Sequence, residues 1–110
     1  IRMVQNLKLV KVAYVWLGDS PLLIDVGEKI DFTLRKLTSG ARSIIENYTS
    51  MGALFTIARS DNNTNPQATV TLASPITIAE GDMLAVIGAE TGVITPTTGE
   101  LAITFLFEIV

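Results

Sequence analysis

The chain has 110 residues, the usual length of one domain, so we expect a single domain over residues 1–110. Its 48% hydrophobic and 17% charged residues supply a core, and the absence of cysteine and histidine removes disulfides, thiolate nucleophiles, imidazole bases and the commonest zinc ligands. We therefore expect no enzyme, metal or cofactor site. The net charge of −3 disfavours a nucleic-acid partner, and no apolar run reaches the roughly 20 residues that span a membrane.

The composition of the whole chain favours β-strands. About a third of its residues are Val, Ile or Thr, and their β-branched side chains pack well on a pleated sheet. No signal peptide is expected, since the first residues lack a charged region followed by an apolar stretch. The first predicted strand covers residues 10–17. Its two faces are both largely apolar: Val10, Val12, Tyr14 and Trp16 on one, and Lys11, Ala13, Val15 and Leu17 on the other.

Further strands follow from alternation between turns rich in Gly, Pro, Asn and Asp. The segment 42–51 is ambiguous, because Ile44, Ile45 and Tyr48 have helical spacing and a turn of helix is an alternative there. The final strand, 101–110, alternates over ten residues, with apolar odd-numbered positions. The shorter predicted strands lie near residues 22–26, 30–34, 55–57, 70–72, 76–78 and 84–86.

About eight short strands predict an all-β, antiparallel two-sheet sandwich, either jelly-roll-like or immunoglobulin-like. The missing cysteine pair weakens a true immunoglobulin domain. Apolar residues on the second face of the first and last strands indicate a surface covered by another subunit. The candidate interface residues are Val15, Leu17, Leu106 and Val110. We expect a homo-oligomer.

The charges divide unevenly along the chain. All eight basic residues precede position 60, which gives that part +3, whereas the rest carries six acids and no base, giving −6. Such halves favour head-to-tail self-association. The alternative is that strands from both halves interleave and the difference averages out over the surface.

Carboxylates and Asn residues suggest two candidate sites, a carboxylate pair for glycoside hydrolysis and a calcium loop. Asp25, with Glu28 or Asp31 nearby, offers paired carboxyls of the kind a glycosidase needs, although alternation places Asp25 toward solvent. Asp61, Asn63 and Asn65 resemble the first half of a calcium loop, yet Pro66 and Leu72 stand where that loop needs Gly and Glu. A solvated strand face and a hairpin tip are the simpler interpretations.

Basic and aromatic residues give two further hypotheses. Lys8, Lys11, Arg35 and Lys36 would form a local basic patch if their strands were adjacent. Trp16 and Tyr48 are candidate glycan contacts if they are exposed, whereas burial of Trp16 would make it a core residue.

The order of strands and turns along the chain resembles that of a known family. The segments Ala68–Leu72, Ile76–Ile87 with its Gly81-Asp82 turn, Leu101–Ile109 and the opening Val12–Gly18 are similar to the small jelly-roll domains of tailed-bacteriophage virion proteins. The resemblance covers about two-thirds of the chain and departs from the family near residues 30–51. It implies a decoration, fibre or tail accessory subunit located in the virion, commonly a trimer, with a major capsid or tail protein as partner.

Two other functions stay open. A carbohydrate- or receptor-binding module would present Trp16 or Tyr48 in a groove. A subunit of another extracellular filament would complete a neighbour's sheet with a terminal strand.

Overall fold

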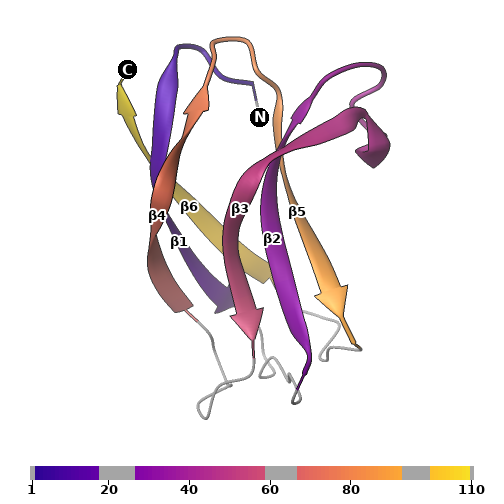
Figure 1. Cartoon of the computed structure of the whole chain (residues 1–110), viewed down its shortest axis with the longest axis vertical. Helices are drawn as coiled ribbons and strands as arrows, with labels where there is room; N and C mark the ends of the chain where they lie inside the picture. The colour runs from indigo at the N-terminus through magenta and orange to yellow at the C-terminus, as the bar shows by residue number, and fades with distance from the viewer. Residues whose placement is uncertain (1, 18–26, 59–66, 93–99, 110) are drawn as a thin grey trace.

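Six antiparallel strands and one turn of 3-10 helix make up the part of the chain that the computed structural model describes, residues 2–17, 27–58, 67–92 and 100–109 (Figure 1). Sheet I has the order β4-β1-β6 and sheet II the order β3-β2-β5. The predicted all-β class with two antiparallel sheets is confirmed, whereas the expected number of about eight strands was wrong. The elements are β1 (Leu7–Leu17), β2 (Lys29–Leu37), η1 (Ile45–Asn47), β3 (Tyr48–Ala58), β4 (Gln67–Ile78), β5 (Leu84–Thr91) and β6 (Glu100–Ile109).

The strand count is lower partly because the expected strands at 70–72 and 76–78 belong to one strand, β4. Leu9 of β1 pairs with Ile76 and Lys11 pairs with Thr71, so residues 72–75 of β4 bulge out of the ladder. Pro75 lies in this bulge, where β4 is an edge strand of sheet I and the missing N–H is tolerated. The strand expected at 22–26 lies outside the described residues.

A second bulge shifts the faces of β1. Leu9 pairs with Phe107 and Lys11 with Leu106, which leaves Val10 as an extra residue. Leu9 and Val12 are therefore both fully buried although they are three residues apart. The expectation that Val10 shares the inner face was wrong, because strict alternation does not hold across a bulge.

The helical alternative at 42–51 reduces to the single 3-10 turn η1, after which β3 begins at Tyr48. Ile44 and Ile45 are 46% and 45% exposed, so they do not form the buried face that their spacing suggested. The loop is held instead by polar contacts: the Asn47 side chain donates to the Ala41 carbonyl over 3.0 Å, and the Tyr48 hydroxyl donates to the Arg42 carbonyl over 2.9 Å.

The start of the chain closes one end of the sandwich. The Met3 N–H donates to the Asp82 carbonyl and the Gly81 N–H donates to the Met3 carbonyl, both over 2.8 Å. The Met3 side chain is buried in the core cluster. The N-terminal segment thus acts as a short extra pairing partner for the connection between β4 and β5.

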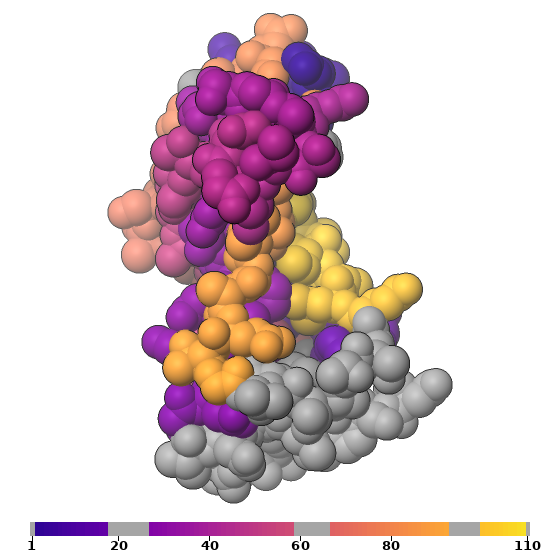
Figure 2. Space-filling view, turned by 90° about the vertical axis from the view of Figure 1, so that its right-hand side faces the viewer, coloured from indigo at the N-terminus to yellow at the C-terminus, as the bar shows by residue number. Residues whose placement is uncertain are grey.

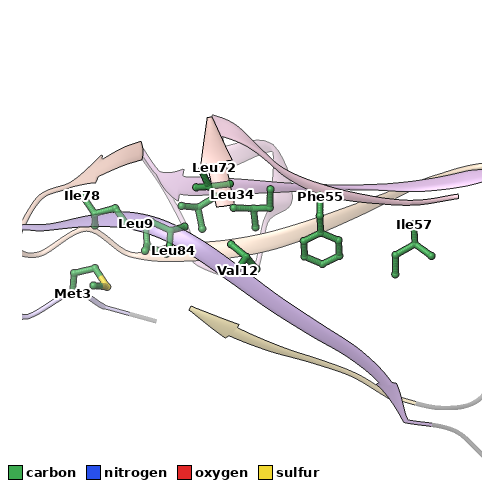
Figure 3. Close-up of a cluster of buried hydrophobic side chains, with 10 residues drawn as sticks. Met3, Leu9, Val12, Leu34, Phe55, Ile57, Leu72, Ile78 and Leu84 are labelled. Carbon is green, nitrogen blue, oxygen red and sulfur yellow. The ribbon is translucent and has the colours of Figure 1, made fainter. Parts of the chain in front are cut away.

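The core lies between the sheets, and Figure 3 shows its buried side chains. Beside it, the rings of Tyr14, Phe55 and Phe32 stack in a row, with centroids 4.2 Å and 4.6 Å apart. Burial raises the pKa of the Tyr14 hydroxyl above its ordinary value. The buried core residues come from the N-terminal segment and from β1 to β5: Met3, Leu9, Val12, Leu34, Leu54, Phe55, Ile57, Leu72, Ile78 and Leu84.

Candidate functional site

The outer face of sheet I carries the expected interface residues. Because Leu9, Val12 and Tyr14 point into the sandwich, the intervening β1 residues point outward. Val15 lies between Gln67 of β4 and Ala102 of β6. The other outward rows are Thr69-Ala13-Thr104, Thr71-Lys11-Leu106 and Thr77-Lys8-Glu108, with Leu17 opposite Glu100 at the far end.

A shallow hollow of about 440 Å³ lies on this face, toward the end where β1 ends and β4 and β6 begin. Small side chains line it, since Ala13 and Ala102 leave the sheet surface low between the taller residues on either side. Thr69, Thr104 and Gln67 add hydroxyl and amide groups at its rim. The hollow therefore offers shape and a few neutral hydrogen-bonding groups, and no charged side chain lines it.

Three of the four expected interface residues share this face. Leu17 and Leu106 are each 53% exposed, and Val15 is half-buried between them along the sheet. The fourth, Val110, lies outside the described residues. The structure thus brings Val15, Leu17 and Leu106 onto one surface because β1 and β6 are neighbours in sheet I, with the hollow among them.

The sandwich is covered unevenly around this surface. The β6 residues that face inward, Leu101, Ile103, Phe105 and Phe107, pack against the core and remain only half-buried. Ile109, expected to continue that inner face, is 81% exposed. Figure 2 shows this side of the molecule, with β5 in orange and β6 in yellow at the surface. In the described part of the chain, β6 is the one strand that contributes nothing to the fully buried core.

The two candidate glycan contacts do not come together. Trp16 is on the inner side of β1 in sheet I and packs against the core. Tyr48 begins β3 at the edge of sheet II, and its hydroxyl donates to the Arg42 carbonyl. The interpretation of Trp16 as a core residue fits this placement, and the structure forms no shared aromatic platform from the pair.

The carboxylates are arranged as surface groups. Asp31 accepts a hydrogen bond from the Thr56 hydroxyl over 2.6 Å and lies 3.5 Å from the Lys29 ammonium. The Thr56 hydrogen bond, followed by the Lys29 charge, lowers the pKa of Asp31, the opposite of what a general acid requires. Asp25 lies outside the described residues, as do Asp61, Asn63 and Asn65. The described residues contain no cluster of three or more acidic groups able to hold a metal ion.

The expected basic patch is not assembled. Lys8 and Lys11 point outward from sheet I, whereas Arg35 pairs with Ser50 and Ala85 on the outer side of sheet II. The charged halves of the chain do not form separate faces either. Strand β1 lies between β4 and β6, and β5 pairs with β2, so strands from the two halves interleave, as the alternative expected.

Sequence reasoning missed the hollow. Ala13 and Ala102 are unremarkable in the sequence, and their alignment with Thr69 and Thr104 depends on the register of three strands distant along the chain. Small residues at outward positions of both terminal strands were the available signal.

Comparison with known proteins gave no match among protein-family models, curated proteins or solved structures. Among the described residues, no helix is long and apolar enough to cross a membrane.

Proposed function

We propose that this chain is a non-enzymatic structural subunit that assembles through sheet I. The observation that carries the proposal is the set of apolar side chains that β6 leaves in water: Leu106 is 53% exposed on the outer side and Ile109 is 81% exposed, while Phe105 and Phe107 on the inner side are partly buried. Large apolar side chains gathered on one side of a domain mark an interaction surface. A partner that covers sheet I would remove them from water.

The kind of assembly we favour is the virion type to which the sequence bears a resemblance, as a capsid decoration, fibre or tail accessory subunit. The antiparallel sandwich supports this role, because the first and last strands are neighbours in one sheet and the chain passes repeatedly between the sheets. A jelly-roll-like path is part of the proposal. The genes beside its coding sequence test the virion role: capsid or tail genes are expected, and a cluster of metabolic genes would contradict it.

Sedimentation velocity tests assembly itself. We expect the wild-type protein to form an oligomer at micromolar concentration, and the mass distinguishes a dimer from the trimer that the resemblance implies. Leu106→Lys places a charge on the exposed outer face of β6 and is expected to shift the protein toward monomer.

Ala89→Lys is the matched control, because Ala89 is exposed on β5 and lies opposite Asp31 on the outer side of sheet II. It adds the same charge to an edge strand of the other sheet. A wild-type protein that sediments as a monomer at these concentrations would contradict the proposal, as would equal loss of assembly in both variants.

A further inference from the structure

The four edge strands of the sandwich differ in how they resist pairing with another strand. β3 carries two extra residues in its ladder with β2, at Leu54 and Met51. β4 is broken by the bulge that contains Pro75. β5 carries Glu90, which lies opposite Ile30 on the inner side of sheet II. Bulges, prolines and inward charges are the devices that prevent edge-to-edge association.

β6 has none of these devices. Its ten residues, Glu100–Ile109, contain no Pro, Gly, Lys or Arg, and the bulge in its ladder with β1 is on the β1 side, at Val10. Its two acids lie near its ends and point outward, opposite Leu17 and Lys8. Among the described strands, β6 has β1 as its single partner. It is therefore a long, regular edge that is open to strand addition.

The sequence of β6 is complementary to itself in the antiparallel register centred on Phe105, which pairs more of its described residues than a register centred on Ile103 or Leu106. With Phe105 opposite its own copy, Ile103 faces Phe107 and Leu101 faces Ile109, so the inner side becomes a continuous apolar ladder. On the outer side Thr104 faces Leu106, and Ala102 faces Glu108. A shift that centres the pair on Thr104 would instead place Glu100 opposite Glu108 twice, and directly opposed like charges destabilise a sheet.

We propose that two copies of this chain pair antiparallel through β6, with Phe105 at the two-fold axis, and join their sheets I into one six-stranded sheet. The partner is a second copy because this register matches apolar with apolar and opposes no like charges among the described residues. The inference rests on the proposed function, since it names the contact by which sheet I assembles. It favours a dimer over the trimer that the resemblance implies.

Disulfide trapping tests the register, and the chain is suited to it because it contains no cysteine of its own. Thr104→Cys and Leu106→Cys are prepared as two separate proteins, at positions that are both exposed. They are mixed in equal amounts and oxidised with glutathione. Residues directly opposite each other have Cβ atoms about 4.5–5.5 Å apart, against about 7–8 Å for diagonal neighbours, and a disulfide needs about 3.5–4.5 Å. Random pairing of equal amounts already gives twice as much mixed dimer as either homodimer. The proposed register should raise the mixed dimer well above that random share, and intact mass distinguishes all three products.

Thr69→Cys mixed with Thr71→Cys is the matched control, because both residues are exposed on the outer side of β4, at the opposite edge of sheet I. We expect no preferred mixed dimer from this pair. Equal yields from the β4 and β6 mixtures would overturn the inference, since random collision would then explain the cross-links.

Sedimentation of the uncross-linked wild-type protein separates the two proposals. An oligomer without preferred trapping of the β6 pair would overturn the β6 contact and leave assembly through another part of sheet I. A monomer without trapping would overturn both. A dimer with the mixed disulfide as its main oxidised product supports both.

Discussion

The two open sides of the sandwich are built differently. Where β3 approaches β4, Gly52 lies against Ile76, and both strands contribute fully buried side chains to the core. Where β5 and β6 flank the sandwich, Leu84 is buried and β6 supplies four partly buried apolar side chains. The core is thus closed more completely on the β3–β4 side than on the β5–β6 side. The proposal of assembly through sheet I rests on this contrast.

Truncation of core side chains is expected to show the largest difference in stability between the β3–β4 side and the β6 side. Leu54 on β3 is 3% exposed, so Leu54→Ala is expected to lower the free energy of unfolding by about 2–5 kcal/mol. Ile103→Ala on β6 should cost the monomer roughly half as much, because that side chain is still partly in water. Urea denaturation at a concentration low enough to keep the protein monomeric measures both. Equal losses would show that the β6 side is as well packed as the other.

Two glycine substitutions make a finer comparison. Gly52 has φ of +148°, and a Cβ there would lie 3.2 Å from Ile76 Cδ1, so Gly52→Ala is expected to cost about 1–3 kcal/mol through backbone strain. A Cβ at Gly88 of β5 would lie 2.9 Å from Phe32 Cε1, so a side chain would have to move there, but the backbone is not in the positive-φ region. Gly88→Ala should therefore cost about 1 kcal/mol. Thermal unfolding ranks the two, and the reverse order would show that side-chain crowding at Gly88 outweighs backbone strain at Gly52.

The smallest expected effect concerns the pH dependence of stability. The pKa of Asp31 is lowered in the folded state, so this carboxylate stabilises the protein above its unfolded pKa of about 3.9, and the contribution is lost as the pH falls through the folded pKa. Wild type should thus lose slightly more stability than Asp31→Asn between pH 6 and pH 3. Urea midpoints of both proteins at the two pH values test this. An equal fall in midpoint for wild type and Asp31→Asn would show that the Thr56 hydrogen bond contributes nothing to stability.

Much of the fold followed from local alternation. The period of two predicted the all-β class, the two antiparallel sheets and the shared face of Val15 and Leu17 on the first strand, whereas the pairing that places Leu106 beside them depends on tertiary register. It failed where the ladder is irregular, because the bulges at Val10 and at residues 72–75 shift faces and join two expected strands into one. Neither bulge has a sequence signature that separates it from a turn.

The lower burial of β6 compared with the other strands could not be predicted from the sequence either. Phe105 and Leu34 look alike as apolar residues of alternating strands, yet Leu34 is fully buried and Phe105 is not. The difference depends on how the two sheets face each other, which is set by tertiary packing and not by local pattern.

Hydrogen exchange measured at two protein concentrations tests the central claim most directly. If sheet I assembles through β6, exchange of the backbone amides in residues 100–109 should slow as the protein is concentrated from well below to well above its dissociation constant, while exchange in β3, residues 48–58, stays the same. An exchange rate in residues 100–109 that is independent of concentration, or protection that appears in β3 instead, would contradict the account.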